Sequence, residues 1–410
     1  MRIGVITQWY PPENVWVPKA LVDGLRAQGH EVTVVTGAPH YPTGTVAEGY
    51  RADRFRTETI DGVTVHRVPE FPYRGTGMVG RLAGYASFAL AASVRAVTAL
   101  GSMDAVVVYD SPATAALPAM VLRTLRRVPF VLQVQDIWPD SVIDAGFVHG
   151  SAKLRAIRTA LGAFVSASYR MSSHVTVITP SAVNLLASRG VPRDKLSLVY
   201  NWIDDPAREL EPEGVTPLRV RIGARDDDRV FLYAGAMGPP QNLGHLVDGF
   251  VAAGLGTSAH LVLLGPGVEH NTLAGRAADL PTVHVLDPVP ITEANVLLRE
   301  ATAGIVSLAD TLLHRATFPS KVQGMCALGV PVLAVAPGDV GRFVIEHGAG
   351  MAVSPGSIAE VAEAFRSLAA AGRLEVEGFA ARSRAAYEAE FTESVGGARI
   401  IAALTASRQS

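Results

Sequence analysis

The sequence predicts an α/β protein made of two Rossmann-like, doubly wound domains. The chain has 410 residues, which is too long for a single hydrophobic core. Strand-like and helical stretches alternate along almost all of it, as is typical of a parallel sheet with helices on both faces. A proline-containing, charged segment at residues 203–217 interrupts this alternation once. The interruption divides the chain into two successive α/β series.

The first domain is expected over residues 1–202. It begins with a strand at 2–7, a proline-rich loop at 8–18, a helix at 19–28 that Gly29 closes, and a second strand at 31–36. Together these form a βαβ unit. Further strands are predicted at 63–68, 105–109, 130–135, 175–179 and 196–200, and helices at 78–100, 114–127, 154–170 and 181–188.

The second domain is expected over residues 218–380, after an exposed linker at 203–217. Strands are predicted at 230–233, 260–264, 283–285 and 303–306, and helices at 243–253, 271–278 and 293–299. A helical segment at 381–410 ends the chain.

The composition narrows the classes of partner and compartment. The net charge is −2, from 36 basic and 38 acidic residues, so no strong field attracts nucleic acid, and we expect no such partner. The single cysteine, Cys326, excludes an intramolecular disulfide and is consistent with a cytoplasmic protein. The start of the chain resembles a strand rather than a signal peptide. The apolar run at residues 82–94 is shorter than the roughly 20 residues of a membrane span.

The segment at residues 318–335 is the strongest indication of a binding site. It is expected to form a polar loop, a short helix, a turn and a buried strand, with Ser320 and Lys321 in the first helical turn. A helix N-terminus offers unpaired N–H groups to an anion, and these two side chains add a hydroxyl and a positive charge. The segment therefore predicts a phosphate site, although an ordinary loop with a solvated lysine has the same local pattern.

Glycines that follow the first two strands of the second domain point to the same ligand. Gly235 and Gly238 would let the backbone approach a pyrophosphate, with Gln241 or Asn242 as neutral donors. Gly265 lies in the corresponding loop after the next strand. A plain tight turn is the alternative explanation.

An ordered set of motifs along the chain resembles the retaining glycosyltransferases of family 4, and within them the subgroup of aminosugar transferases similar to WbuB. The resemblance covers nearly the whole chain. It rests on residues 10–13 (YPPE), 29–36 (GHEVTVVT), 41–44 (YPTG), 135–141 (QDIWPDS), 200–204 (YNWID), 233–235 (YAG), 264–267 (LGPG) and 319–321 (PSK).

The resemblance implies a GT-B fold, in which two Rossmann-like domains face a cleft. It implies that the C-terminal domain holds a nucleoside-diphosphate sugar, with UDP favoured, and that the N-terminal domain holds the acceptor. The acceptor would be a glycan, a lipid-linked sugar or a small molecule, and neither a metal nor a further cofactor is implied. The terminal helix would cross back to the first domain.

Asp136 is the candidate catalytic residue on the acceptor side, because it ends an otherwise apolar strand. Trp138 follows it as a surface on which a sugar ring could stack. Asp136 could instead cap the following turn. Glu13, Asn14 and Lys19 in the first loop and helix, and Asn201, are expected near the cleft; Lys19 could equally be a solvated lysine.

The chain departs from the family at a pair of glutamates. Their positions correspond to Ala316 and Gly324, so both carboxylates are absent, and Asp339 or Asp310 could approach the sugar instead. This departure keeps two alternatives open, a sugar-nucleotide-binding pseudoenzyme that activates a partner and a GT-B nucleotide-sugar epimerase. A Rossmann oxidoreductase is disfavoured, because no G-x-G-x-x-G follows either first strand.

The predicted helix at residues 78–100 bears on the acceptor. Its apolar run is flanked by Arg74, Arg81 and Arg95, so it could meet a membrane or the domain core. Leu82, Tyr85, Phe88 and Leu90 are its bulky apolar residues. We expect the core, with at most weak, salt-sensitive membrane association through the arginines.

Overall fold

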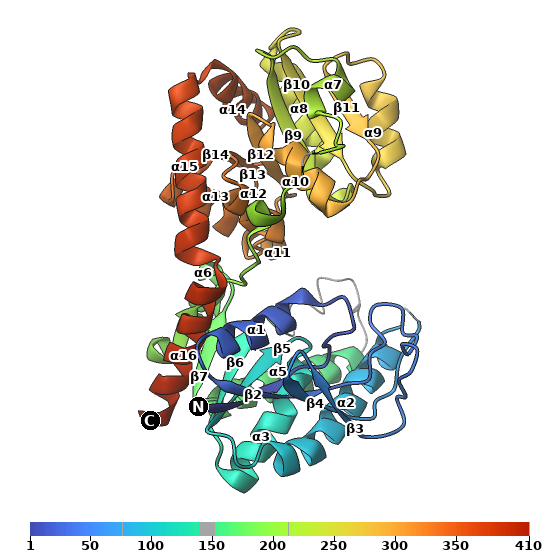
Figure 1. Cartoon of the computed structure of the whole chain (residues 1–410), viewed down its shortest axis with the longest axis vertical. Coiled ribbons are helices and arrows are strands. Elements are labelled where there is room, and N and C mark those ends of the chain that lie inside the picture. Colours follow the sequence, from blue (N-terminus) through green and yellow to red (C-terminus); the bar gives the residue numbers. More distant parts are fainter. Residues whose placement is uncertain (76, 139–151, 212, 410) are drawn as a thin grey trace. The chain divides into compact units, whose positions relative to one another are not determined.

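The protein consists of two compact units. In the computed structural model, residues 1–202 together with the segment from Glu393 onward form the first unit, and Ile203–Thr392 form the second. The structure describes residues 1–75, 77–138, 152–211 and 213–409. Each unit is an α/β sandwich around its own sheet (Figure 1).

The first unit contains an eight-stranded sheet in the order β3-β4-β2-β1-β5-β6-β7-β8. All pairs are parallel except β3 with β4. The strands are β1 (Arg2–Ile6), β2 (Glu31–Thr36), β3 (Arg56–Ile60), β4 (Val63–Arg67), β5 (Ala105–Asp110), β6 (Phe130–Val134), β7 (His174–Val177) and β8 (Leu196–Leu198). The strand order reverses direction between β1 and β5, and the carboxyl ends there are where such sheets bind ligands.

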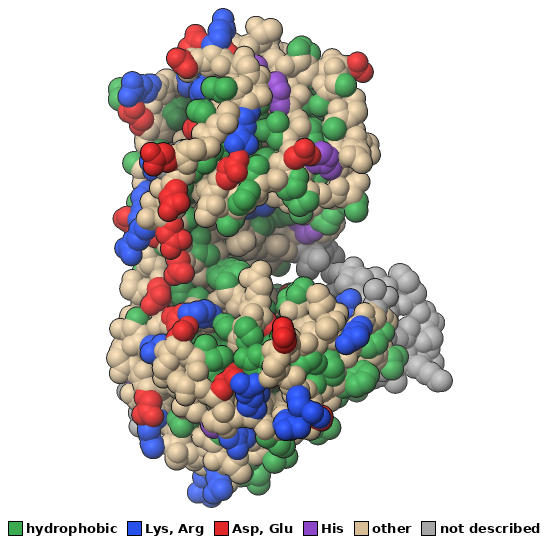
Figure 2. Space-filling view, turned by 45° about the vertical axis from the view of Figure 1, so that its right-hand side comes forward, with side chains coloured by type: hydrophobic (Ala, Val, Ile, Leu, Met, Phe, Trp, Pro, Cys, Tyr) green, Lys and Arg blue, Asp and Glu red, His purple; other side chains and the backbone are tan. Residues whose placement is uncertain are grey.

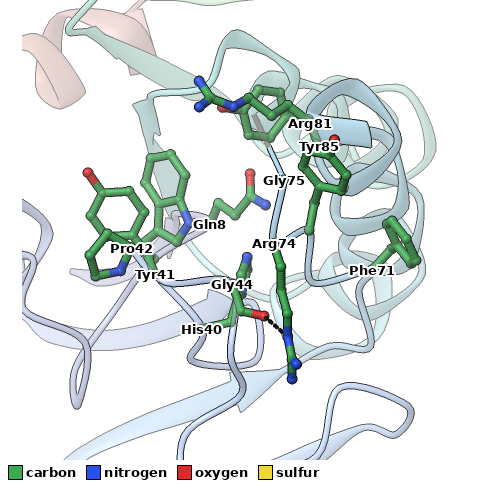
Figure 3. Close-up of a pocket in the computed structure, with 13 residues that line it drawn as sticks. Gln8, His40, Tyr41, Pro42, Gly44, Phe71, Arg74, Gly75, Arg81 and Tyr85 are labelled. Atoms are coloured by element: carbon green, nitrogen blue, oxygen red, sulfur yellow. Dashed lines mark hydrogen bonds between the residues drawn. The ribbon is translucent and has the colours of Figure 1, made fainter. Parts of the chain in front are cut away.

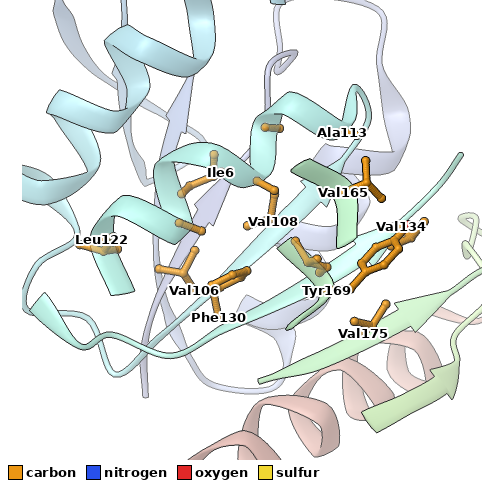
Figure 4. Packing of buried hydrophobic residues seen from close by; sticks show 14 of the residues in the cluster. Ile6, Val106, Val108, Ala113, Leu122, Phe130, Val134, Val165, Tyr169 and Val175 are labelled. Atoms are coloured by element: carbon orange, nitrogen blue, oxygen red, sulfur yellow. The ribbon is translucent and has the colours of Figure 1, made fainter. Parts of the chain in front are cut away.

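Helices cover both faces of this sheet. They are α1 (Trp16–Ala27), α2 (Met78–Ala99), α3 (Ala116–Arg126), α5 (Ala152–Met171), α6 (Pro180–Ser188) and α16 (Glu393–Gln409). One core cluster joins the sheet to α2, α3, α5 and α6, and Figure 4 shows part of it around Phe130 and Tyr169. A second cluster joins the other face to α1 and α16. The β-branched residues of β5 and β6 are almost completely buried, as expected for central parallel strands.

Helix α2 is only partly a core helix. Phe88 is fully buried and Leu82 and Tyr85 pack against the core, but Val79, Leu90 and Val94 are more than 60% exposed. By length and composition alone, Val79–Ala99 could cross a membrane, with a mean hydropathy of 1.3 and a third of that window buried. The apolar run at residues 82–94 was expected to be too short to cross a membrane. That expectation is wrong for the whole helix, which is long enough. Apolar side chains do reach the surface of the first unit, seen in the lower part of Figure 2.

The second unit contains a six-stranded parallel sheet in the order β11-β10-β9-β12-β13-β14, the strand order of a Rossmann fold. The strands are β9 (Arg229–Ala234), β10 (Ala259–Leu264), β11 (Val283–Leu286), β12 (Ala303–Ser307), β13 (Val332–Val335) and β14 (Gly350–Val353). The helices are α7 (Leu218–Ile222), α8 (Leu243–Ala253), α9 (His270–Ala277), α10 (Ile291–Arg299), α11 (Leu312–Arg315), α12 (Ser320–Leu328), α13 (Asp339–Glu346), α14 (Ile358–Ala370) and α15 (Arg373–Glu390). Its reversal point lies between β9 and β12.

The segment expected as an exposed linker is bound to α15 at both Ile203 and Asp205. The Tyr387 hydroxyl donates to the Ile203 carbonyl at 3.0 Å. Asp205 caps the 3₁₀ helix Pro206–Glu209 and forms a bidentate ion pair with Arg384 of α15, at 2.9 and 2.8 Å. The guanidinium hydrogen bonds hold the pKa of Asp205 below its usual range. The terminal helical stretch is two helices: α15 belongs to the second unit, and α16 packs on α1 in the first.

Candidate active site

The loops of the second unit that follow β9 and β10 are built from glycines in close backbone contact. Gly235 and Gly265 have φ values of 146° and 139°, which other residues rarely adopt. A Cβ on Gly265 would lie 2.3 Å from the carbonyl oxygen of Gly235, and one on Gly267 would lie 1.9 Å from that of Met237. The two loops can lie against each other only because these positions lack side chains.

Lys321 reaches this glycine loop from the first turn of α12. Its Nζ lies 3.9 Å from the centre of the Tyr233 ring, and a Cβ on Gly235 would lie 2.8 Å from it. No carboxylate of the described residues forms an ion pair with it. Desolvation by burial lowers the pKa of Lys321 to about 8. A half-buried ammonium without a counter-charge is a site that favours an anion.

The start of α12 adds backbone donors. Pro319 precedes the helix and no side chain caps it. The Val322 N–H donates to the Pro319 carbonyl at 3.1 Å, so it is not available to a ligand. The N–H groups of Ser320 and Lys321 keep no acceptor within the described part of the chain, and the Ser320 side chain is exposed.

The other predicted donor-binding residues lie on the turn between β9 and α8. Gly238 is extended and has room for a Cβ, so its own packing does not require glycine. Gln241 lies on the 3₁₀ helix Pro239–Gln241, and its carbonyl accepts a 2.6 Å hydrogen bond from the hydroxyl of Ser307, the last residue of β12. Asn242 has a φ of 49° and precedes α8 without capping it. The structure thus ties this turn to the reversal point of the sheet.

The carboxylates suggested as substitutes for the absent glutamates are engaged elsewhere. The Asp339 side chain is fully buried, 3.7 Å from Arg342, and Asp310 forms a bidentate pair with Arg315. Gly324 lies one turn after Lys321 on α12, and a Cβ there would meet open space. Neither of these two carboxylates therefore replaces the missing glutamate at Gly324.

Asp136 lies at the carboxyl end of β6 in the first unit. Its side chain is exposed to solvent, and its carboxylate accepts a 3.2 Å hydrogen bond from Ser111. Desolvation by the surrounding protein raises the pKa of Asp136, and the hydrogen bond from Ser111 opposes this rise. Asp110 ends the neighbouring strand β5 and is buried, and burial followed by the charge of Asp136 raises its pKa well above its usual range. The sequence reasoning overlooked Asp110, whose signal was a carboxylate at the end of an apolar strand.

Trp138 and Asn201 make structural contacts instead of facing a ligand. Trp138 is only 7% exposed and lies edge-on to Tyr85 in the core, so its face is not a platform for a sugar; the following Pro139 lies outside the described residues. Asn201 and Gln135 exchange two hydrogen bonds, of 2.7 and 3.2 Å. This amide pair links the ends of β6 and β8.

The first loop of the chain is held by Glu13. Its buried carboxylate accepts hydrogen bonds from the backbone N–H groups of Tyr10, His40 and Tyr41, at 3.1, 2.8 and 2.7 Å. Burial raises the pKa of Glu13, and these hydrogen bonds oppose the rise. Glu13 therefore organises two loops rather than facing a ligand, while Asn14 is exposed in the turn.

Lys19 differs from Lys321 in having counter-charges. It lies in α1, which begins at Trp16 instead of the expected residue 19, and its Nζ is 2.6 Å from Asp23 and 3.6 Å from Asp61. The hydrogen bond to Asp23 raises the pKa of Lys19. Its charge is thus already compensated within the protein.

A cavity of about 330 Å³ opens beside these loops in the first unit (Figure 3). It lies at the carboxyl ends of β1, β2 and β4 and against α2. Its walls are mostly aromatic and basic: Gln8, Trp9, His40, Tyr41, Pro42, Gly44, Phe71, Tyr73, Arg74, Gly75, Arg81, Gly84 and Tyr85. The sequence reasoning used residues 41–44 only as a motif and missed the cavity, because its walls come from four separate segments.

Two family models match the chain, one in each unit. A glycosyl transferase 4-like domain matches residues 16–202, and a domain of the glycosyl transferases group 1 matches residues 228–371.

Two curated relatives are glycosyltransferases by name. WcaI of Escherichia coli K12, named for colanic acid biosynthesis, is 27% identical over 60% of this chain and 62% of its own length, so the alignment spans less than two thirds of that protein. An uncharacterized glycosyltransferase of Methanocaldococcus jannaschii is 23% identical over 69% of this chain and 68% of its own length.

Solved structures show the same architecture at low sequence identity. HepE of Anabaena has a TM-score of 0.64 at 15% identity, covering 99% of both chains. A trehalose 6-phosphate synthase of Burkholderia multivorans has a TM-score of 0.69 at 15% identity, covering 100% of this chain and 99% of its own. The chain thus has the GT-B fold, and each of its units carries its own match to a glycosyltransferase domain.

Proposed function

We propose that this protein is a retaining glycosyltransferase that moves a sugar from a nucleoside-diphosphate sugar to a hydroxyl group of an acceptor. UDP is the favoured nucleotide, and the sugar is a hexose or an N-acetylated aminosugar, as in the WbuB-like subgroup. The acceptor is a glycan precursor, a lipid-linked sugar or a small molecule. The proposed reaction needs neither a metal nor a further cofactor, as the family resemblance implies.

The observation that carries this proposal is the environment of Lys321. Its desolvated ammonium lies against the Gly235 loop, beside two backbone N–H groups of α12. Negative charge accumulates on the leaving diphosphate when the glycosidic bond breaks, so a cation placed there stabilises the transition state. UDP as the nucleotide is supported by HepE, which was solved with UDP and with UDP-glucose.

Asp136 serves the acceptor side in this proposal. Its exposed carboxylate, with a pKa raised by neighbouring protein atoms, is suited to accept the proton of an acceptor hydroxyl. Ser111 orients it through one hydrogen bond, and Asp110 lies behind it in a buried position where the neutral acid is favoured. Retention of the anomeric configuration is proposed from the family resemblance alone.

One observation keeps a binding protein without turnover as the second candidate. The positions of the paired glutamates are Ala316 and Gly324, and the nearby carboxylates are already in ion pairs. Such a protein would bind the nucleotide sugar at Lys321 and release no product. The epimerase alternative is not favoured, because both domain matches are to glycosyltransferases.

We further propose that the protein acts in the cytoplasm and associates at most weakly with membranes. The arginines near the start of α2, rather than its exposed apolar side chains, would provide this contact, so it should weaken at high salt. Sedimentation with anionic liposomes at low and high salt tests the statement. Binding that survives high salt would contradict it.

A panel of nucleotide sugars tests the function. Thermal shift reports binding, and release of the nucleoside diphosphate reports reaction, with and without candidate acceptors. We expect the UDP-sugars to stabilise the protein most and to be hydrolysed slowly without an acceptor. Stabilisation without any release would favour the binding protein, and the absence of both would contradict the nucleotide site.

A further inference from the structure

We propose that Tyr233 is a positioning residue for the nucleotide diphosphate: its ring face holds the Lys321 ammonium in place of a carboxylate, and its hydroxyl holds the loop of Gly235 beside that cation. This inference rests on the proposed transferase function. It adds the group that keeps the charge of Lys321 in place and available to the nucleotide.

The Tyr233 ring is a buried surface in contact with a cation. Tyr233 is the last residue but one of β9, has no exposed surface and belongs to a core cluster of the second unit. The Lys321 Nζ lies 3.9 Å from the ring centre, within the roughly 6 Å over which an ammonium is attracted to the face of an aromatic ring. This attraction is stronger where the contact is removed from water. The ring therefore holds the ammonium at the carboxyl end of β9.

A ring holds a cation without cancelling its charge. A carboxylate would neutralise Lys321, as Asp23 does for Lys19 in the first unit, whereas the quadrupole of a ring carries no net charge. The carboxylates considered for the sugar, Asp310 and Asp339, pair with arginines instead. A diphosphate that arrives at Lys321 therefore meets the full positive charge and displaces no protein carboxylate.

The ring also favours the charged form of the lysine. Burial lowers the pKa of Lys321 to about 8. An aromatic face stabilises the ammonium and not the neutral amine, so it opposes this effect of burial. Removal of the ring should therefore lower the pKa of Lys321 further and leave more of it neutral near pH 7.5.

Gly235 leaves the space in which the cation and the ring meet. A Cβ at this position would lie 2.8 Å from the Lys321 Nζ and 3.6 Å from the Tyr233 hydroxyl oxygen. A side chain there would displace the ammonium, because the end of a long lysine side chain moves more easily than the backbone. The glycine thus serves the position of the lysine as well as the conformation of its own loop.

The Tyr233 hydroxyl fixes the same loop. It donates to the Ala236 carbonyl at 2.6 Å, so the loop folds back over the tyrosine that precedes it. Burial raises the pKa of Tyr233 well above its ordinary value, so the hydroxyl remains a donor at neutral and mildly alkaline pH. The Gly235 N–H also donates to the Leu264 carbonyl, at 2.9 Å. One side chain thus connects the glycine loop to the lysine of α12.

Lysine NMR tests the contact in the unmodified protein. The chain has four lysines, Lys19, Lys153, Lys195 and Lys321, and only Lys321 belongs to the second unit. Protein with ¹³C-labelled lysine therefore gives four sets of side-chain signals, and Lys321→Met identifies the relevant set by its loss. We expect the ε-methylene protons of Lys321 to be shifted upfield, because they are next to an ammonium that lies over a ring face. An ordinary lysine position for this signal would overturn the proposal.

Titration of the same signal separates the hydroxyl from the ring. Tyr233→Phe keeps the ring, so the midpoint of Lys321 should not change, while the freer loop should lower UDP affinity about 3-fold. Tyr233→Leu removes both groups, so the midpoint should fall by about one pH unit and UDP affinity at pH 7.5 by about 10-fold. One midpoint for all three proteins would refute the role of the ring. Unchanged UDP affinity in Tyr233→Phe would refute the role of the hydroxyl.

Phe231→Leu is the matched control. Phe231 lies two residues before Tyr233 on the same strand, is equally buried, and packs against Phe250 and Phe365. Its loss should leave the Lys321 midpoint and UDP affinity unchanged. A midpoint that fell equally in Phe231→Leu and Tyr233→Leu would overturn the proposal, because loosened core packing would then explain the change. Thermal unfolding shows whether each variant is folded. If Tyr233→Leu does not fold, the unmodified protein and Tyr233→Phe decide the two roles.

UDP binding separates this proposal from the function on which it rests. UDP affinity that depends on Lys321 but not on Tyr233 would refute the role of Tyr233 alone. An upfield-shifted Lys321 signal in a protein that binds no UDP would refute the transferase and its diphosphate site, while the contact of the cation with the ring would stand.

Discussion

The two units have the same strand arrangement at their binding edges but opposite chemistry. In the first unit, carboxylates follow the strands: Glu13 after β1, Glu70 after β4, Asp110 at the end of β5 and Asp136 after β6. In the second unit, Gly235 and Gly265 follow β9 and β10, and Lys321 lies against them. The fold sets where a ligand can bind, and the side chains after each strand set which charge it carries.

This difference matches the two halves of a glycosyl transfer. A diphosphate brings negative charge and needs backbone N–H groups and a cation, which requires glycines and excludes acids. An acceptor hydroxyl loses a proton and needs a carboxylate close to it. Removing the charge of Lys321 should therefore weaken nucleotide binding. Removing the charge of Asp136 should instead lower turnover and leave nucleotide binding almost unchanged.

The largest effect should come from Asp136→Asn. The substitution keeps the shape and removes the charge and the basicity, so turnover should fall about 10²–10⁴-fold with little change in UDP affinity. In the unmodified protein, turnover should also fall as the pH drops through the raised pKa of Asp136, because the protonated acid cannot accept the acceptor's proton. Steady-state kinetics over a pH series measures both.

Asp110→Asn is the matched control for this experiment. Burial favours the neutral form of Asp110, and an amide has almost the same shape as that form. We expect turnover close to that of the unmodified protein. If Asp110→Asn lost as much activity as Asp136→Asn, the two carboxyls would have to be treated as one catalytic pair.

The second effect should come from Lys321→Met, which keeps an unbranched apolar stem and removes the ammonium. UDP affinity should fall by about 1.5–3 kcal/mol, the scale of a charge-assisted contact with an anion. Isothermal calorimetry measures it. Lys19→Met is the matched control in the first unit. Asp23 already compensates the charge of Lys19, so this variant should leave UDP affinity unchanged. A UDP affinity that did not respond to Lys321→Met would remove Lys321 from the site.

A third change should affect one unit only. Glu13→Gln replaces a carboxylate oxygen by an NH₂ group that cannot accept from the N–H groups around it, so the first unit should lose about 1–3 kcal/mol of unfolding free energy. Urea unfolding followed by tryptophan fluorescence reports this unit, since it holds all four tryptophans. UDP binding at low urea should not change. An unaltered unfolding curve would mean that Glu13 does not hold these loops.

The sequence was sufficient for the architecture of each unit. Runs such as Ala105–Asp110 are so rich in β-branched residues that they can only be buried strands, and the GT-B fold was expected from the ordered motifs and is confirmed by the structure. The edge strand β3 was missed, because its residues Arg56–Ile60 are charged and mostly exposed. Edge strands carry weaker apolar patterns than central ones.

The site was less predictable, because burial and pairing decide what a side chain can do. Lys19 and Lys321 look alike in the sequence, yet one is paired with Asp23 and the other lies unpaired over Tyr233. Trp138 has the pattern of an exposed aromatic after a strand, but it is in the core. The cavity at Gln8 and Trp9 needs segments that only tertiary structure brings together.

The smallest effect is a change in protonation that distinguishes the two lysines. With a pKa of about 8, Lys321 is about half protonated at pH 8 and almost fully protonated at pH 7. A bound diphosphate favours the charged form, so UDP binding at pH 8 should take up about half a proton, and much less at pH 7. The affinity should correspondingly weaken as the pH rises through 8. Calorimetry in two buffers of different ionisation enthalpy gives the number of protons taken up. Lys321→Met should abolish this uptake. Lys19→Met should keep it, because the pKa of Lys19 is raised and its protonation does not change near pH 8. Equal heats in both buffers at pH 8 would mean that the ammonium of Lys321 does not meet the diphosphate.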